Sequence, residues 1–373
     1  MATANLVRYR RPRATIQEPS ESVSQFATVT VCIPARNEVA NIEECVRSVL
    51  SSRGIDLEVI VHDDQSVDGT GAIVDRIALE DPRVRRLECE PLPPGWNGKQ
   101  WGCDRMGRAA IGKWVLFTDA DVRLSPECVR LTLETAIHAK CDLISTIPRQ
   151  ITGTCMEDAV IPLIHFMLLS YLPMGSMRKT TTPAASAGCG QFLFVSKDAW
   201  EKSGGHESFR SSMHDGIQLP RSIRRAGGRT DLFDGTELVS CRMYRSFSQV
   251  WQGFAKNAFE GLGSIALLIF ITFIHLTGHV LPWVWLLIAW PLDQLWTLPS
   301  LLAVVAIGIA IGERVALARR FHQRPRSVVL HPIGILLMTA IQWHSLWITM
   351  AGRRHGRAWR QLARGCDVPQ HRP

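Results

Sequence analysis

The sequence predicts an α/β domain with a mostly parallel, Rossmann-like sheet, followed by transmembrane helices. Strand-like apolar runs alternate with segments of helical periodicity over residues 27–260. Three uncharged apolar stretches follow, each close to or above the length that spans a bilayer. These stretches are residues 262–290, 297–312 and 328–352. A chain of 373 residues has room for one large domain and such an appendage.

The strands and helices of the domain are expected to alternate along the chain. The expected strands are 28–33, 57–61, 84–87 and 114–117, and helical patterns run through 42–50, 70–79 and 100–110. Strands joined by helices form a parallel sheet with helices on both faces. Ligands of such sheets bind beyond the carboxyl ends of the strands.

Polar clusters stand at three of these strand ends, in residues 34–38, 63–70 and 119–121. In the last cluster, Asp119 and Asp121 are spaced one apart, so their side chains point the same way. Such a pair can hold a hard divalent cation while phosphates fill the remaining positions. A solvated acidic turn is the other interpretation of an isolated Asp-x-Asp, and the two neighbouring clusters favour the metal site.

The clusters together resemble a known family. Residues 33–38 (Ile-Pro-Ala-Arg-Asn-Glu), 63–70 (Asp-Asp-Gln-Ser-Val-Asp-Gly-Thr) and 119–121 (Asp-Ala-Asp) have the order and spacing of a family 2 glycosyltransferase of the GT-A fold. Residues 96–103 are similar to the Gly-Lys-x-Trp-Ala segment of a membrane-bound subset that glycosylates carotenoids or is associated with hopanoid synthesis. The resemblance covers about residues 27–260.

The resemblance implies a role for each matching residue on the donor side. The expected donor nucleotide-binding residues are Pro34, Arg36, Glu38, Asp63, Asp64, Lys99 and Asp119. Lys99 would lie near the donor diphosphate, and an Asp can accept a hydrogen bond from a uracil ring, so the donor is expected to be UDP-linked. Asp119 and Asp121 would hold Mg²⁺ or Mn²⁺, with Asp121 as the direct ligand.

Further residues are expected on the acceptor side. An inverting transfer needs a base for the acceptor hydroxyl, and Asp215 resembles the family's base, although His214 takes the usual preceding acidic position. Asp215 as a mere helix N-cap is the alternative. Gly188, Gly190 and Gln191 resemble the loop that faces the acceptor; an ordinary turn is the alternative there.

Residues 249–254 lack the Arg-Trp pair of the Gln-x-x-Arg-Trp motif found in processive members. This departure favours transfer of a single sugar. The apolar stretch 160–177 is expected either in the membrane interface near the acceptor or as a buried core helix. The ten cysteines include no Cys-x-x-Cys pair, which argues against a zinc ribbon and a disulfide framework.

Basic residues, which give a formal net charge of +8, crowd beside the apolar stretches. They are Arg314, Arg319, Arg320, Arg324 and Arg326 in one group and Arg353, Arg354, Arg357, Arg360 and Arg364 in the other. Basic loops stay on the cytoplasmic side, so the charge is interpreted as membrane topology and nucleic-acid binding is not expected. If both groups are cytoplasmic, however, residues 328–352 cannot be a simple span.

These observations divide the chain into a disordered basic tail (1–26), a GT-A domain (27–260), a transmembrane region (261–352) and a second basic tail (353–373). The predicted protein is a multi-pass enzyme of the plasma (inner) membrane, with its catalytic domain facing the cytoplasm. It would move one sugar from a nucleotide-sugar donor to a carotenoid- or hopanoid-like lipid acceptor. A nucleotidyltransferase and a non-catalytic membrane scaffold are the alternatives.

Overall fold

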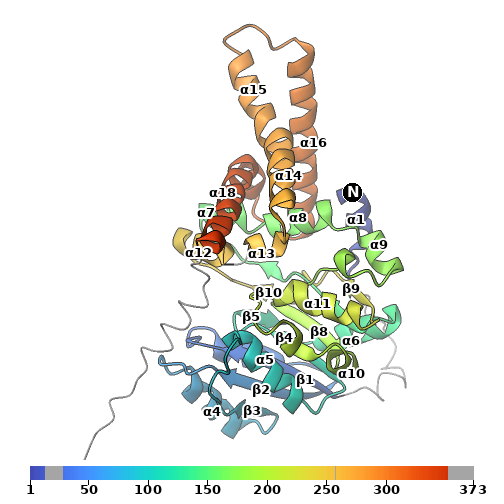
Figure 1. Cartoon of the computed structure of the whole chain (residues 1–373), viewed down its shortest axis with the longest axis vertical. Helices are drawn as coiled ribbons and strands as arrows, with labels where there is room; N and C mark the ends of the chain where they lie inside the picture. The colour runs from blue at the N-terminus through green and yellow to red at the C-terminus, as the bar shows by residue number, and fades with distance from the viewer. Residues whose placement is uncertain (13–27, 257, 352–373) are drawn as a thin grey trace, which may run out of the picture.

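The computed structural model describes residues 1–12, 28–256 and 258–351, and it confirms the predicted α/β sheet (Figure 1). Seven strands have the order β3-β2-β1-β4-β8-β6-β9. Their bounds are Val84–Leu87 (β3), Asp56–Asp63 (β2), Thr28–Ala35 (β1), Trp114–Thr118 (β4), Phe192–Ser196 (β8), Leu143–Ser145 (β6) and Thr230–Leu232 (β9). The sheet is mixed, because β8 runs antiparallel to both β4 and β6 while the other pairs are parallel.

Helices cover both faces of this sheet, as the alternating side chains of its strands require. In β1, for example, Val29, Val31 and Ile33 enter one apolar core and Cys32 enters the other. Helices α3 (Ile42–Leu50), α4 (Thr70–Glu80) and α6 (Cys128–Ala139) pack in the first core. Helices α5 (Gly98–Ala109), α10 (Lys197–Lys202) and α11 (Asp215–Arg225) pack in the second, with the 3₁₀ turn Gly205–Phe209.

A small second sheet lies between the main sheet and the apolar helices (Figure 1). It has the order β5-β10-β7, with bounds Val122–Leu124, Val239–Cys241 and Arg149–Gln150. Strand β5 begins directly after Asp121, and its Val122 pairs with Cys241 of β10. This pairing brings Cys241, far along the chain, beside the predicted metal ligand.

A layer of short helices lies between the sheets and the C-terminal region. It consists of α7 (Cys155–Val160), α8 (Leu163–Tyr171), α9 (Met174–Lys179) and the 3₁₀ turn Pro183–Ala185. Val160, Phe166 and Leu169 are buried there with Leu317 and Ile335 from the C-terminal helices. The apolar stretch 160–177 therefore forms buried helices, one of its two predicted alternatives.

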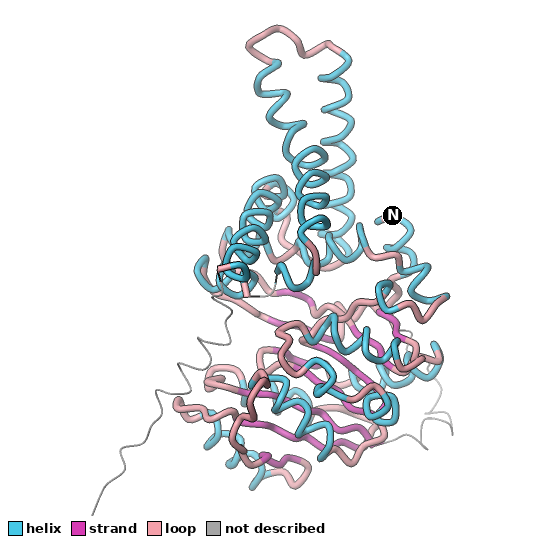
Figure 2. Tube along the Cα trace, viewed as in Figure 1, coloured by secondary structure: helices cyan, strands magenta, loops and turns pink. Residues whose placement is uncertain are grey.

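Three helical segments after residue 260 are long and apolar enough to cross a membrane: Ile265–Ala289, Leu298–Arg320 and His331–Met350. The first consists of α14 (Ile265–His275), a π-helical turn (Leu276–Val280) and α15 (Leu281–Ala289), and it forms a hairpin with α16 (Leu298–Arg320). The shorter helices α12 (Phe247–Ala255) and α13 (Ala258–Leu262) precede this hairpin, and α17 (Arg326–Val329) follows it. The third apolar segment is α18 (His331–Met350). Figures 1 and 2 show the hairpin rising alone above the rest of the molecule.

Two boundaries differ from the prediction. The middle apolar helix continues beyond residue 312 to Arg320, because its last turns pack against the domain and bury Arg314 and Leu317. Part of the predicted disordered tail is also folded: α1 (Ala2–Arg8) packs on α8 and α9. The side chain of Asn5 donates to the Leu169 and Leu172 carbonyls, at 2.8 and 2.7 Å, which anchors this helix. Residues 13–26 and the predicted basic tail 353–373 lie outside the described residues.

Candidate active site

The three predicted polar clusters meet at one edge of the main sheet. β1, β2 and β4 are parallel neighbours, so Ala35, Asp63 and Thr118 end them on the same side. Pro34 aligns with His62 one step before that edge. The Thr118 hydroxyl donates to the Gln191 carbonyl at 2.8 Å, which fixes the chain just before the Asp119–Asp121 pair.

The loops after β1 and β2 are bonded to each other. Arg36 donates from Nη1 to Asp64 Oδ2 at 3.1 Å, and the backbone N–H of Glu38 donates to Thr70 Oγ1 at 2.8 Å. The Asp63 carboxylate accepts from Ser66 N at 3.1 Å, so it closes its own loop. Four of the predicted donor-binding residues, Arg36, Glu38, Asp63 and Asp64, thus lie on one wall made by these two loops.

This wall reaches the start of α5, which carries Lys99. A Cβ placed on Gly98 would lie 2.8 Å from Asp64 Oδ2, so the glycine leaves room for the Asp64 carboxylate in this position. Asn97 caps the helix by accepting from Lys99 N at 2.9 Å. The cap directs the Lys99 side chain from the first turn of α5 toward the carboxylates at the end of β4.

Lys99 joins the predicted donor side to the predicted base. Its Nζ lies 2.7 Å from Asp119 Oδ1 and 2.9 Å from Asp215 Oδ2. Burial opposes the charge on Lys99, but the two carboxylates outweigh burial and hold the pKa of Lys99 above its usual value. Burial would raise the pKa of Asp215, yet Lys99 holds it below its ordinary range, so Asp215 is ionised at neutral pH.

Asp215 is the first residue of α11 and lies against the predicted acceptor loop. Its Oδ1 accepts from Gly216 N at 2.8 Å. A Cβ on Gly190 would lie 2.1 Å from that same oxygen, and one on Gly188 would lie 2.9 Å from Leu193 Cδ2. Both glycines therefore allow this loop to pack closely on Leu193 and the start of α11.

The structure contains features that fit a divalent cation at Asp121. Burial and the neighbouring Asp119 carboxylate raise the pKa of Asp121 to about 7, and Asp121 Oδ1 is buried without a hydrogen-bond partner. A bound cation would stabilise the ionised form of Asp121 and would give its Oδ1 a partner. Within residues 1–12, 28–256 and 258–351, no three His, Cys, Asp or Glu side chains form a metal site by themselves. One or two carboxylates completed by substrate phosphates is the arrangement that Mg²⁺ and Mn²⁺ accept.

The side chain of Gln191 is buried and does not point freely toward an acceptor. Its Oε1 accepts from Gln150 Nε2 at 2.9 Å, and its Nε2 donates to Cys241 Sγ at 2.9 Å. Cys241 pairs with Val122, the residue directly after Asp121, and its thiol influences the pKa of Asp121. The Gln191 side chain is therefore held by residues near the predicted metal ligand Asp121 and has a structural role there.

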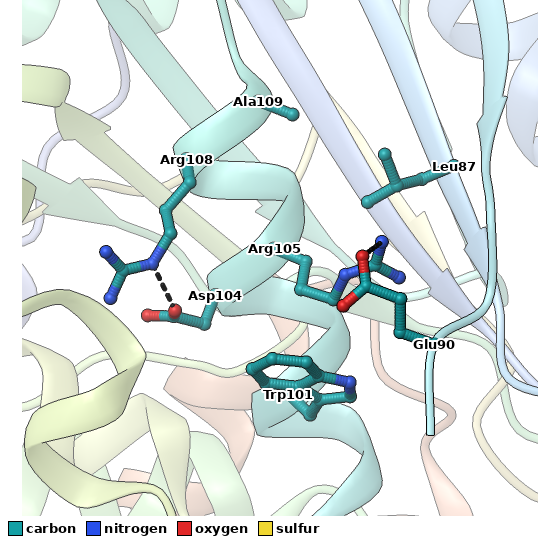
Figure 3. A pocket seen from close by; sticks show the side chains of 7 residues that line it. All are labelled: Leu87, Glu90, Trp101, Asp104, Arg105, Arg108 and Ala109. Carbon is teal, nitrogen blue, oxygen red and sulfur yellow. Dashed lines mark hydrogen bonds and ion pairs between the residues drawn. The ribbon is translucent and has the colours of Figure 1, made fainter. Parts of the chain in front are cut away.

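A hollow on the domain surface lies along α5, and none of the predicted site residues lines it (Figure 3). Its lining residues are Leu87, Glu90, Trp101, Asp104, Arg105, Arg108 and Ala109. The charges that face it are paired, since Arg108 Nε lies 2.7 Å from Asp104 Oδ2 and Arg105 Nη2 lies 2.6 Å from Glu90 Oε1. The hollow offers a donor diphosphate no free cation, so the site at the sheet edge remains the candidate.

Comparison with known proteins identifies the domain. The sequence model of Glycosyl transferase family 2 matches residues 30–202. The chain contains a family 2 glycosyltransferase domain. The match includes every predicted donor, metal and acceptor-loop residue and ends before Asp215.

Two curated relatives of this chain are described as 4,4'-diaponeurosporenoate glycosyltransferases. The one from Staphylococcus haemolyticus is 25% identical over 248 residues, covering 64% of this chain and 62% of that protein. The one from Staphylococcus aureus (strain USA300) is 24% identical over 240 residues, covering 63% and 62%. The match thus spans less than two thirds of either relative.

A solved structure supports the fold of the family 2 domain. The mannosyltransferase PcManGT from Pyrobaculum calidifontis, in complex with GDP-Man and Mn²⁺, superposes with a TM-score of 0.55 at 18% identity. The superposition covers 92% of this chain and 95% of that one. It confirms the predicted GT-A fold.

The candidate site has a neighbour, Tyr244, that sequence patterns did not reveal. Tyr244 faces α12: a Cβ on Gly253 would lie 2.1 Å from the Tyr244 oxygen. Burial raises the pKa of Tyr244, and the charges of Asp121 and Asp119 raise it further. Gly253 stands where the Trp of the Gln-x-x-Arg-Trp motif would be, counted from Gln249, and only the tertiary contact explains this glycine.

Proposed function

We propose that this protein is a membrane-anchored glycosyltransferase that moves a single sugar from a nucleotide sugar to a lipid acceptor. The observation that carries the proposal is the bridge of Lys99 between Asp119 and Asp215. Through Lys99, the donor-side residue Asp119 and the candidate base Asp215 both lie within hydrogen-bond distance of one ammonium group.

The donor nucleotide binds along the wall made by Arg36, Asp63 and Asp64, and its diphosphate lies near Lys99. We propose a UDP-sugar, because an Asp carboxylate on this wall can accept a hydrogen bond from the uracil N–H. The Mn²⁺ in the related mannosyltransferase supports a divalent cation in the same fold. Asp121, with Asp119, would hold Mg²⁺ or Mn²⁺, which would neutralise the charge that grows on the diphosphate.

Transfer follows an inverting course with Asp215 as the base. Lys99 is the charge that depresses the pKa of Asp215. When the diphosphate attracts Lys99, that depression weakens, and Asp215 becomes a better acceptor for the proton of an acceptor hydroxyl. Lys99 then faces the leaving diphosphate. Its ammonium group thus holds Asp215 ionised before the donor binds and stabilises the leaving group afterwards.

The acceptor is a carotenoid- or hopanoid-like lipid carrying a hydroxyl or carboxyl group. Two observations support this class: the description of the two relatives, and the apolar helices joined to the domain. Transfer of one sugar is supported by the missing Arg-Trp pair after Gln249, with Tyr244 lying over Gly253. The protein lies in the plasma (inner) membrane, and its catalytic domain faces the cytoplasm. Nucleotide sugars are made in the cytoplasm.

The test compares lipid extracts from cells with and without the full chain by mass spectrometry. We expect lipids heavier by one hexose, and purified protein should release a nucleoside diphosphate from the donor. Release of pyrophosphate from a triphosphate would favour the nucleotidyltransferase alternative. Absence of any turnover with intact nucleotide binding would favour the scaffold.

Asp215→Asn separates the role of the base from donor binding. The amide cannot take a proton, so transfer to a hydroxyl acceptor should fall by about a hundredfold or more, while nucleotide affinity stays nearly unchanged. Asp198→Asn, on the exposed surface of α10, is the matched control. Weaker nucleotide binding in Asp215→Asn would assign this residue to the donor site or to a helix cap.

A further inference from the structure

The last apolar helix, α18, poses a topological problem. It is long and apolar enough to cross a membrane, yet basic groups stand on both of its sides in the sequence. If α18 crosses, one of these groups lies on the far side, against the tendency of basic loops to stay on the cytoplasmic side.

The segment that leads into α18 is fastened to the catalytic domain. Arg320 Nε lies 2.8 Å from Asp234 Oδ2, and His322 Nε2 lies 2.8 Å from Glu237 Oε1. Arg326 pairs with Asp158 of α7. The first turn of α18 is also close to the domain, since a Cβ on Gly334 would lie 2.0 Å from the Ala159 carbonyl oxygen.

The other end of α18 contacts the domain as well. Trp251 of α12 donates from Nε1 to His344 Nδ1 at 3.0 Å, and the backbone N–H of Phe259 donates to Ser345 Oγ at 3.1 Å. Both donors precede the first apolar span in the chain. A helix of 20 residues is about 30 Å long, as long as the hydrocarbon core is thick. A crossing helix would therefore hold its two ends on opposite sides of the bilayer.

The exposed side of α18 forms a single stripe. Its members follow one another at helical spacing of three or four residues: Ile333, Leu336, Ala340, Trp343, Trp347 and Met350. The opposite side is buried against the protein and includes the polar residues Thr339, Gln342 and Ser345. An apolar stripe on one side of a helix whose other side is covered by protein fits a helix that lies in a membrane interface, where Trp is enriched.

We propose that α18 does not cross the bilayer but lies in the leaflet nearest the catalytic domain, with its exposed stripe against the lipid. The chain then crosses the membrane twice, through Ile265–Ala289 and Leu298–Arg320. Both groups of arginines lie on the catalytic side. Only the turn 290–297, which has no Lys or Arg, reaches the far side.

The packing at the base of the hairpin agrees with this arrangement. His331 at the start of α18 hydrogen-bonds His279 of the π-helical turn, with 3.1 Å between Nε2 and Nδ1. The near half of the hairpin therefore has α18 as its neighbour, while the far half stands free (Figure 1). Trp343 of the exposed stripe donates from Nε1 to Thr272 Oγ1 of α14 at 3.1 Å, and Phe270 and Phe273 of α14 are exposed.

The first test labels cysteines in sealed membrane vesicles with an impermeant maleimide, and needs no enzyme activity. The exposed native Cys89 and Cys155 both report the side of the catalytic domain. Leu292→Cys reports the hairpin turn, and an epitope added after Pro373 reports the end of the chain. We expect the epitope to be accessible together with Cys89, and Leu292→Cys to be accessible only from the opposite side. An epitope on the side of Leu292→Cys would overturn the proposal.

The second test places a lysine in the middle of each helix. Ala340→Lys in α18 and Ile309→Lys in α16 both change exposed residues. A lysine at the centre of a crossing helix is expected to lower membrane insertion by roughly tenfold or more. We expect that loss for Ile309→Lys and near-normal amounts for Ala340→Lys. An equal loss for both variants would show that α18 crosses. The proposed sugar transfer can fail without affecting either test.

Discussion

At the scale of single residues, Asp121 is a buried carboxylate that lacks a hydrogen-bond partner on one oxygen, Oδ1. Burial raises the pKa of Asp121 to about 7. Asp121→Asn removes a charged ligand of the proposed cation, so turnover should fall by about two orders of magnitude or more, while the domain stays folded.

The measurement is turnover over a series of Mn²⁺ concentrations, with chelator as the zero point. Asp75→Asn, which only breaks a surface pair with Arg86, is the control. Activity near the wild-type level in Asp121→Asn, or activity that chelator leaves unchanged, would contradict the metal role.

His206 makes the stability of the domain depend on pH. It is fully buried, accepts from Trp200 Nε1 through Nδ1 at 3.1 Å, and burial lowers its pKa to about 3. Because the unfolded chain binds a proton near pH 6.5 and the folded chain does not, stability is lost as pH falls below about 6.5. Between pH 7 and pH 5 this loss amounts to about 2 kcal/mol.

His206→Asn keeps an acceptor for Trp200 and removes the titration. Thermal unfolding of both proteins in detergent at pH 7 and pH 5 gives the comparison. The variant should lose less stability than the wild type over this interval. Equal losses in the two proteins would show that other groups cause the pH dependence.

At the scale of elements, α13 connects the membrane region to the loop before the base. The Glu260 carboxylate accepts from the Ser212 hydroxyl and, at 3.3 Å, from Met213 N. Ser212 Oγ accepts from His214 N at 3.0 Å, one residue before Asp215. Glu260 thus acts as a positioning residue for the start of α11.

Glu260→Ala should lower kcat by about tenfold, because charged hydrogen bonds of this kind contribute about 1.5–3 kcal/mol. Glu260→Gln keeps one acceptor and should restore part of kcat. Nucleotide affinity should stay unchanged in both variants, since the donor wall is untouched. Glu201→Ala, an exposed site on α10, is the control. Parallel changes in kcat and nucleotide affinity would indicate a general structural role instead.

At the scale of the whole molecule, the catalytic domain and the C-terminal helices share one apolar core. Leu317, Phe321, Ile335, Met338 and Ile341 pack on residues of α7, α8 and α12. A chain ended at Gly261 would expose these surfaces to water at about 25 cal/mol per Å² of apolar area. The C-terminal helices are therefore part of the fold rather than a detachable anchor.

We expect the chain ended at Gly261 to aggregate in aqueous buffer and to require detergent for nucleotide binding. Size-exclusion chromatography with and without detergent checks this expectation. A full-length chain carrying Asp121→Asn should remain monodisperse under the same conditions in detergent. A monomeric, soluble truncated domain would show that the shared core contributes little.

Much of the fold and of the candidate site could be predicted from local sequence. Short apolar runs indicate the strands, and parallel neighbours bring their carboxyl ends to one edge, so residues 34–38, 63–70 and 119–121 had to be close. The uncharged stretches after residue 261 likewise specified apolar helices. These features depend on the spacing of residues near one another in the chain.

Only the tertiary structure decided which distant surfaces meet. The contact of Lys99 with Asp215, the link from Gln191 through Cys241 to Asp121, and the anchoring of Asn5 on α8 join segments far apart in sequence. The same holds for the two ends of α18, both fastened to the domain. Local periodicity tells which side of an element is apolar, but shape and hydrogen-bond complementarity between distant elements select the partner that covers it.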